Sequence, residues 1–244
     1  MIVDVSIVIT SYNYAHYVSE CVRSCLDQQF TPLEHEVIVV DDGSTDATPA
    51  ILAGIEDPRL QKFRIVNSGI EVASNYGFAQ SRGRYIVRVD ADDKLNSDYL
   101  RCIAATLDEQ YGFFYPDYKV INSDGIVTET IALPDFDDSE IICRGDFLAT
   151  GTLFRASVLK AAGVYSTREK NSGLENYELI LTLLEKGIRG CHIPQSLFYY
   201  RRHANNTSKT MRERIILNGQ ALFARHGLGP FRTNQHHPYK LVLQ

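Results

Sequence analysis

The 244-residue sequence has neither a long apolar run nor an excess of basic residues. No stretch approaches the 18 or more apolar residues of a membrane span, and the opening stretch carries Asp4 without the basic region that begins a signal peptide. The formal net charge of −5 argues against binding nucleic acid or acidic lipid through bulk electrostatics, which needs a clustered basic face. These absences predict a cytoplasmic protein with no nucleic-acid partner.

Cysteine is also sparse, and its spacing excludes a common kind of metal site. Of five cysteines, only Cys21 and Cys25 are close in sequence, at a spacing that puts both on one helix face. A zinc site would need a second clustered pair. The cysteines are therefore expected to be small buried residues in a reducing compartment.

Repeats, low-complexity tracts and Gly/Ser-rich linkers are absent as well, so a single domain over residues 1–244 is expected. What is present is an alternation of strands and helices. Apolar, β-branched runs at residues 5–9, 37–40, 63–66 and 85–89 alternate with segments of helical spacing at 18–26, 49–55 and 71–81. Strands that are apolar on both faces predict an α/β fold with a doubly wound, mostly parallel sheet flanked by helices.

The second half of the sequence has a different pattern, which predicts a mixed α+β structure. A helix over residues 97–109 should lead into a hairpin formed by 113–121 and 126–131. A short strand is expected at 152–154, followed by helices at 156–162, 175–186 and 208–226. Residues 228–244 are expected to form an irregular or loosely held tail.

Three polar clusters follow predicted strands, at residues 10–13, 41–46 and 90–93. Ligands of such sheets bind at the carboxyl ends of the strands, so these clusters should share one crevice. Asp90, Asp92 and Asp93 would repel one another without a cation, and Mg²⁺ or Mn²⁺ is commonly held by one or two carboxylates plus substrate phosphates. The alternative is a solvated turn or a helix cap.

Two residues in the first two clusters have the chemistry to hold a nucleoside. Tyr12 could stack on a base, although a lone tyrosine more often serves packing. The carboxylate pair at Asp41 and Asp42 could accept a hydrogen bond from a base or a ribose hydroxyl, or could cap the next helix.

The second half supplies candidates for proton transfer and metal binding. Glu175 and Glu178 are three residues apart and share a helix face, so either could act as a general base, or both could stabilise the helix dipole. His203 could bind a metal or a phosphate, and Arg201 and Arg202 could bind a phosphate.

Taken together, TSYN at 10–13, VVDDGSTD at 39–46, the glycines and aromatics of 75–77 and 83–86, and VDADD at 89–93 resemble the family 2 glycosyltransferases of the GT-A fold. The resemblance covers the first 95 or so residues strongly and extends more weakly to residue 203. It implies an inverting, metal-dependent hexosyl- or N-acetylhexosaminyl-transferase. Residues 1–110 would bind the nucleotide sugar, and residues 111–227 would face the acceptor.

The resemblance also implies roles for particular residues. Thr10 and Tyr12 would surround the base, usually uracil, and Asp42 would bond to it. Asp90 and Asp92 would contact the ribose and the metal diphosphate, with His203 completing the metal or diphosphate site. The acceptor would be a glycan or a lipid-linked sugar, as in polysaccharide biosynthesis, which would bring the protein to the inner face of the membrane as a peripheral protein.

One departure from the family pattern concerns the base. The family commonly has a Glu-Asp pair at this helix start with the aspartate as base, whereas this chain has Glu175 and Asn176. Asparagine cannot accept the proton, so Glu175 is the candidate base and Glu178 the alternative. A protein that binds a nucleotide sugar without transferring it is the main competing hypothesis. A nucleotidyltransferase would be expected to have a glycine-rich basic loop after its first strand, which TSYNYAH is not.

Overall fold

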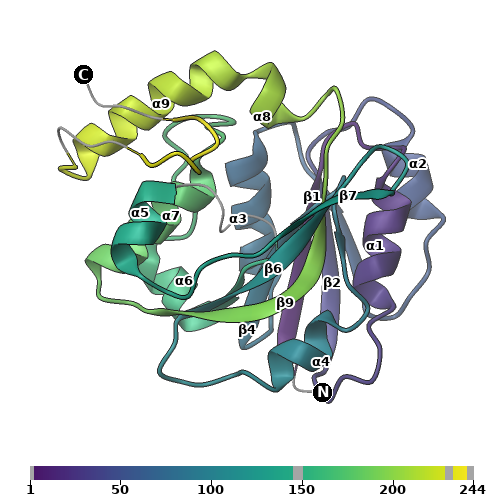
Figure 1. Ribbon diagram of the computed structural model, residues 1–244. Coiled ribbons are helices and arrows are strands. Elements are labelled where there is room, and N and C mark those ends of the chain that lie inside the picture. The colour runs from purple at the N-terminus through teal and green to yellow at the C-terminus, as the bar shows by residue number, and fades with distance from the viewer. Residues whose placement is uncertain (1–2, 145–150, 229–232, 241–244) are drawn as a thin grey trace.

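The computed structural model describes residues 3–144, 151–228 and 233–240. Its centre is one sheet with the strand order β3-β2-β1-β4-β8-β6-β9-β5, and β7 pairs with β6 at the side (Figure 1). The strands of the first half are β1 (Val5–Ser11), β2 (His35–Asp41), β3 (Leu60–Arg64) and β4 (Tyr85–Asp90). They pair in parallel and are aligned so that their carboxyl ends meet at one edge of the sheet.

Helices cover both faces of this sheet, so every residue of β1 and β2 is buried. On one face lie α1 (Val18–Leu26), α2 (Thr48–Ala53) and α4 (Tyr99–Ala104). The other face is covered by α3 (Ile70–Gln80), α6 (Ala156–Ala162) and α7 (Glu175–Glu185), with α5 (Asp138–Arg144) beside them. The α/β prediction with a mostly parallel, flanked sheet is therefore confirmed.

The second half adds mixed pairing to the sheet, as expected. The hairpin of β6 (Phe113–Ile121) and β7 (Val127–Ile131) is antiparallel, and β8 (Leu153–Arg155) pairs antiparallel with both β4 and β6. The long strand β9 (Gly190–Arg201) runs parallel to β6, and the two-residue strand β5 (Lys94–Leu95) pairs with β9. The sequence pattern did not predict β9.

Two other predictions were wrong in detail. Instead of one helix over residues 208–226, the chain forms α8 (Thr207–Thr210) and α9 (Arg212–Arg225), separated by Met211, whose backbone is not helical. The break allows α8 to cross the end of the sheet while α9 packs against α7. The expected helix over 97–109 is shorter, since α4 ends at Ala104.

The described part of the tail is irregular but not loosely held. Tyr239 and His237 are buried, and Tyr239 joins a third apolar cluster formed mainly by α7 and α9. Residues 229–232 and 241–244, which belong to the same predicted tail, lie outside the described residues. The segment 233–240 is thus part of the core on the α7 side.

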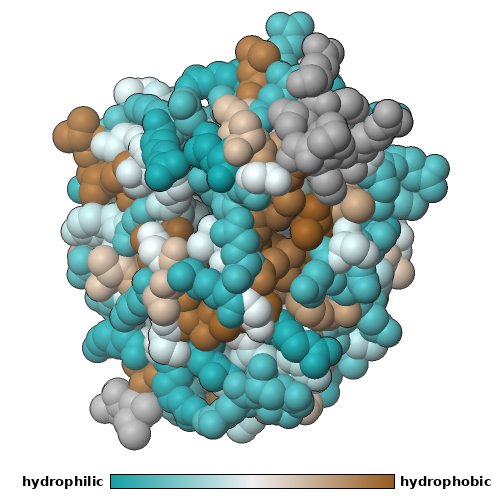
Figure 2. Space-filling model, turned by 90° about the vertical axis from the view of Figure 1, so that its left-hand side faces the viewer, coloured by the Kyte–Doolittle hydropathy of each residue, from teal (hydrophilic) through white to brown (hydrophobic). Residues whose placement is uncertain are grey.

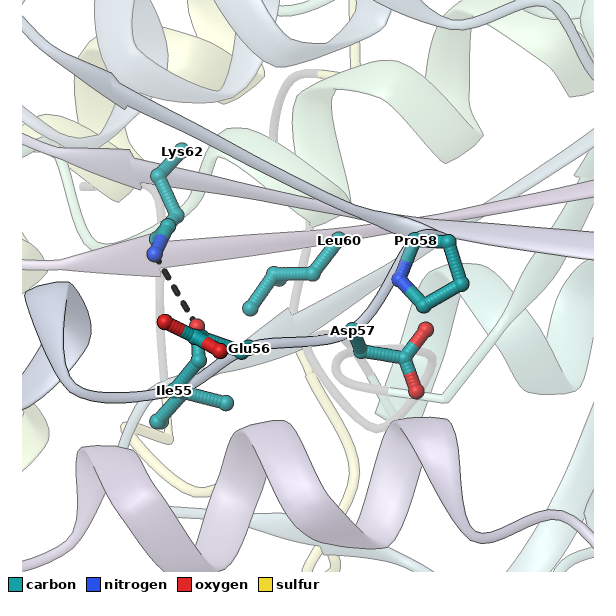
Figure 3. A pocket seen from close by; sticks show the side chains of 6 residues that line it. All are labelled: Ile55, Glu56, Asp57, Pro58, Leu60 and Lys62. Atoms are coloured by element: carbon teal, nitrogen blue, oxygen red, sulfur yellow. Dashed lines mark hydrogen bonds between the residues drawn. The ribbon is translucent and has the colours of Figure 1, made fainter.

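Two regions of the surface away from the carboxyl ends of the strands are hollowed. On the face with α5, α6, α7 and α9, apolar side chains gather in hollows bordered by hydrophilic ones (Figure 2). A separate hollow of about 420 Å³ lies beside the segment that leads into β3, at the amino ends of the strands (Figure 3). There Lys62 donates hydrogen bonds to the carbonyls of Leu52 and Ile55. In the described part of the chain, no helix is long and apolar enough to cross a bilayer.

Candidate functional site

A crevice of about 440 Å³ opens at the carboxyl ends of β1, β2 and β4, beneath the loop that leads into α8. It has the size of a typical small-molecule site. Residues from β4, α3, α7, α8 and the tail share its wall. Six residues singled out in the sequence line it: Thr10, Tyr12, Asp42, Asp90, Asp92 and Glu175.

The loop after β1 is fixed by the loop after β2. Asn13, at φ 59°, accepts hydrogen bonds through Oδ1 from the backbone N–H groups of Thr45 (2.7 Å) and Asp46 (3.3 Å). Its own N–H donates to Ser44 Oγ at 2.9 Å. These bonds leave the neighbouring Tyr12 ring 45% exposed at the rim of the crevice, where a flat ligand could stack on it.

Asp42 is buried beneath the same rim. Its carboxylate accepts hydrogen bonds from the backbone N–H groups of Ser68 (2.7 Å) and Gly69 (2.9 Å), at the start of α3. Burial raises the pKa of the Asp42 carboxyl, while these two donors oppose the rise. The geometry therefore gives Asp42 a fixed orientation at the crevice wall.

The acidic loop after β4 meets the end of β9. His203 Nε2 lies 2.9 Å from Asp92 Oδ2, and His203 Nδ1 accepts the backbone N–H of Asn205 at 3.2 Å. The second bond places the imidazole proton on Nε2, so this nitrogen donates to Asp92. Asn206 lies 3.4 Å from the same oxygen through Nδ2. Burial raises the pKa of the Asp92 carboxyl, the bond from His203 opposes this rise, and the nearby Asp90 adds to it.

Arg201, at the end of β9, fixes this acidic loop from behind. Its side chain is 2% exposed; Nε donates to the Asp92 carbonyl at 2.7 Å, and its backbone N–H donates to Asp93 Oδ1 at 2.7 Å. The guanidinium also pairs with Glu20 of α1 and lies 4.6 Å from the centre of the Tyr17 ring. Arg201 does not line the crevice, which argues against phosphate binding by this residue.

Arg88 joins the acidic loop to α7. It lies in β4, 4% exposed, and donates from Nη1 to Glu175 Oε1 at 2.8 Å and from Nη2 to Asp90 Oδ2 at 3.1 Å. Burial raises the pKa of the Glu175 carboxyl above its usual value, and the Arg88 guanidinium offsets only part of this rise. The candidate base is thus held by a buried cation shared with Asp90.

Asn176 and the loop before α7 are also fixed. The Tyr165 hydroxyl donates to Asn176 Oδ1, and the Tyr165 ring lies 5.4 Å from the Arg88 guanidinium. Glu71 of α3 accepts the backbone N–H groups of Asn171 (2.9 Å) and Ser172 (2.6 Å), which anchors the loop.

Two predicted site residues lie elsewhere. Glu178 faces a different hollow, beside α6 and α9, where Arg225 donates to its Oε1 at 3.1 Å. The structure does not bring Glu178 into the crevice, because one helical turn carries its side chain past the opening. Arg202 pairs with Glu129 on the surface at 2.7 Å.

Asp92 and His203 fit a divalent metal that takes its remaining ligands from substrate. Among the residues that the structure describes, no three His, Cys, Asp or Glu side chains converge as a ready metal cluster. Mg²⁺ and Mn²⁺ are typically held by one or two protein groups plus phosphates and water, so two donors beside a crevice suffice. Ligation through His203 Nε2 would displace the proton now shared with Asp92.

Sequence reasoning missed Arg88, although a signal for it was present. Residues 85–89 read YIVRV, so the arginine interrupts an apolar strand two residues before the acidic loop. A charge in a strand that is buried on both faces requires a buried partner. That partner, Glu175, lies 87 residues further along the chain, beyond the reach of local patterns.

Comparison with known sequences decides the family. The sequence model described as "Glycosyl transferase family 2" matches residues 6–141, which is more than half of the chain. The chain belongs to glycosyl transferase family 2. The matched region includes β1 to β4, both loops that hold Tyr12 and Asp42, and the acidic loop.

Relatives within glycosyl transferase family 2 include proteins of polysaccharide assembly. The succinoglycan biosynthesis protein ExoO of Rhizobium meliloti is 28% identical over 96% of this chain and 72% of its own length. The UDP-Glc:alpha-D-GlcNAc-diphosphoundecaprenol beta-1,3-glucosyltransferase WfaP of Escherichia coli is 29% identical over 89% of this chain and 85% of its length. The chondroitin synthase of Pasteurella multocida is 31% identical over 84% of this chain but only 21% of its own length.

Solved structures share the fold. TarS 1–349 of S. aureus in complex with UDP-GlcNAc superposes with a TM-score of 0.76 and 22% identity, covering 93% of this chain and 67% of TarS 1–349. The mannosyltransferase PcManGT from Pyrobaculum calidifontis, in complex with GDP-Man and Mn²⁺, has a TM-score of 0.70 and 17% identity, covering 97% of this chain and 66% of that protein. These neighbours confirm the expected GT-A-type fold of this family 2 chain.

Proposed function

We propose that this protein transfers a sugar from a nucleotide-diphosphate sugar to an acceptor hydroxyl, with inversion at the anomeric carbon. The observation that carries the proposal is the single crevice that unites Asp42, Asp90, Asp92 and Glu175 in a family 2 chain. Residues 1–110 would bind the donor and residues 111–227 would face the acceptor, within one functional unit of residues 1–244.

The donor is proposed to be a UDP-sugar, with a hexose or an N-acetylhexosamine. Tyr12 is exposed at the rim and would stack on uracil, with Thr10 beside it and Asp42 accepting a hydrogen bond from the base. Asp90, 26% exposed at the end of β4, would contact the ribose. UDP-GlcNAc bound to the structurally similar TarS supports this class of donor.

Asp92 and His203 would hold Mn²⁺ or Mg²⁺ beside the diphosphate. A cation held there would offset the charge that develops on the departing nucleoside diphosphate. The Mn²⁺ in the complex of the similar PcManGT supports this assignment. The buried, negatively charged surroundings of Asp92 favour a bound cation.

Glu175 is the proposed base. It would take the proton from the acceptor hydroxyl as that oxygen forms a bond to the anomeric carbon, and the bond from this carbon to the diphosphate oxygen would break, with its electron pair leaving on the diphosphate. Glu175 lines the crevice, whereas Glu178 points into another hollow. Asn176 takes no part in the proton transfer.

The acceptor is proposed to be a glycan or a lipid-linked sugar in polysaccharide biosynthesis. Two proteins that are similar over most of this chain support this class of acceptor: ExoO is named for succinoglycan biosynthesis, and WfaP is named for a GlcNAc-diphosphoundecaprenol acceptor. A lipid-linked acceptor would place the protein in the cytoplasm at the inner face of the membrane, as a peripheral protein.

The test is a panel of UDP-, GDP- and dTDP-sugars, with and without Mn²⁺, in which release of nucleoside diphosphate is measured. We expect one donor to be hydrolysed slowly in a metal-dependent way, and Asp92→Ala to lower that rate by at least roughly 10²-fold, as for loss of one electrostatic contact to the leaving group. Asp98→Ala, which removes an exposed carboxylate paired with Arg101, is the matched control and should retain the wild-type rate.

Other outcomes point to the competing functions. Metal-dependent UDP binding without turnover on any acceptor would indicate a nucleotide-sugar-binding protein, as Asn176 suggests. Release of pyrophosphate in place of nucleoside diphosphate would indicate a nucleotidyltransferase.

A further inference from the structure

Arg88 lies on a face of β4 that contributes to the apolar core. Ile86, two residues earlier on the same face, packs in the apolar cluster formed with α3 and α7. Arg88 is 4% exposed, and its guanidinium ends at the crevice wall. A buried cation costs several kcal/mol in lost hydration unless its partners are well placed, so the identity of those partners reveals what the residue does.

The partners of Arg88 are two carboxylates from different elements, both of which line the crevice. Glu175, on α7, is 7% exposed and bonds at 2.8 Å; Asp90, at the end of β4, lies 3.0 Å away at its nearest. The guanidinium lies over the ring of Tyr165, whose hydroxyl donates to Asn176. One residue therefore contacts the proposed base, the donor-side carboxylate and the partner of Asn176.

This arrangement accounts for the departure from the Glu-Asp pattern. Asn176 is neutral and accepts the Tyr165 hydroxyl, so position 176 has a structural partner and no proton to exchange. Glu175 has one oxygen, Oε1, bonded to a permanent cation. That bond orients the carboxylate and favours its ionised form, which a proton acceptor requires.

We propose that Arg88 is a positioning residue for sugar transfer, which holds Glu175 as the base and fixes it relative to Asp90 on the donor side. This inference rests on the proposed glycosyltransferase function. Removing Arg88 would leave Glu175 free to rotate and easier to protonate. A displacement of about 1 Å at a reacting group lowers the rate by roughly 10²-fold.

The test is a double-mutant cycle of Arg88→Met and Glu175→Gln, with the rate of nucleoside diphosphate release (kcat) and the Kd of UDP with Mn²⁺ measured for each variant. We expect each single variant to lose roughly 10²-fold in kcat. The double variant should be no slower than the slower single variant, since both changes disable the same group. The Kd of UDP should change far less than kcat.

A matched cycle of Arg225→Met and Glu178→Gln is the control. It removes a different ion pair of α7, in which Glu178 of α7 pairs with Arg225 of α9. That pair lies outside the crevice, and all three control variants should retain the wild-type kcat. If Arg88→Met does not fold because Glu175 is left unpaired, the cycle is run with Arg88→Lys. Removal of both charges in the Arg88→Met/Glu175→Gln variant should restore folding.

Two results would overturn the positioning role while the proposed function stands. One is a kcat of Arg88→Met within about twofold of wild type. The other is a double variant whose loss equals the product of the two single losses. A wild-type protein that releases no nucleoside diphosphate with any donor and acceptor would overturn both proposals.

Discussion

The half proposed to bind the donor (residues 1–110, the donor-side half) and the half proposed to face the acceptor (111–227, the acceptor-side half) shape the crevice by contacts of very different sequence separation. Within the donor-side half, consecutive strand ends support each other, as when Asn13 bonds to Thr45, 32 residues away. The acceptor-side half reaches back across the fold, so that His203 meets Asp92 from 111 residues away. The first half is held together by contacts between neighbouring loops, and the second half is joined to it by pairs that are distant in the sequence.

Because of this difference, we expect the loss of a contact within the donor-side half and the loss of a contact between the halves to have different effects on stability. Loss of a contact between neighbouring loops should be tolerated, because the parallel strands keep the loops adjacent. Loss of a contact between the halves should cost more, because few other bonds fix the same residues. Arg201→Met and Asn13→Gly test this ordering, and His237 in the tail provides a case of intermediate size; the three follow from the largest expected effect to the smallest.

Arg201→Met should produce the largest loss of stability. The buried guanidinium bonds to the Asp92 carbonyl and to Glu20, so its removal leaves several acceptors without a donor. We expect a loss of about 3–5 kcal/mol in the free energy of unfolding, measured with urea, because each hydrogen bond to a charged donor contributes about 1.5–3 kcal/mol. Arg202→Met, which removes the exposed pair with Glu129, is the control and should cost no more than about 1 kcal/mol. Equal losses for the two variants would mean that the contacts of Arg201 between the halves stabilise the fold no more than an exposed ion pair does.

Acidification should produce an intermediate effect through His237 in the tail. Burial, with a contribution from Arg212, lowers the pKa of His237 to about 4, against about 6.5 in an unfolded chain. Because only the unfolded state takes up the proton in this window, stability should fall as the pH drops from about 6.5 to about 4, by at most about 3 kcal/mol.

Thermal melting of wild type and His237→Gln between pH 7.5 and pH 4 would measure this contribution. The variant should lose less stability over that range than the wild type does. Identical pH profiles would show that the segment with Tyr239 does not depend on a neutral imidazole at position 237.

Asn13→Gly should have the smallest effect. Glycine keeps the backbone at φ 59° without strain, so the change removes only the bonds from Thr45 and Asp46 to the side chain. We expect a loss of about 1 kcal/mol in stability and a weaker affinity for UDP, measured by calorimetry. A loss as large as that of Arg201→Met would contradict the proposed difference between the halves.

The same contrast explains what could be predicted from the sequence. The strands around residues 5–9, 37–40 and 85–89 were predicted because each is a local apolar run, and parallel neighbours bring their carboxyl ends together without further information. The meeting of Thr10, Asp42 and Asp90 at one crevice follows from that rule.

The remainder depends on pairings that local patterns do not contain. Strand β9 has Pro194 within it, and its register against β6 shifts near Pro116, so no period of two marks it as a strand. The break at Met211 and the burial of Tyr239 depend on packing against α7. The shared carboxylates of Arg88 became visible only once β4 and α7 were placed side by side.

The position of Arg201 in the sequence also affects the order in which parts of the fold can form during synthesis. The residue that closes the acidic loop emerges from the ribosome 181 residues after its partner Glu20. The four parallel strands can form earlier from local contacts, whereas Asp92 and His203, the proposed metal ligands, can meet only after β9 has joined the sheet. During synthesis, therefore, the strand ends that carry Thr10, Asp42 and Asp90 would come together before Asp92 meets His203, which is translated only after β9.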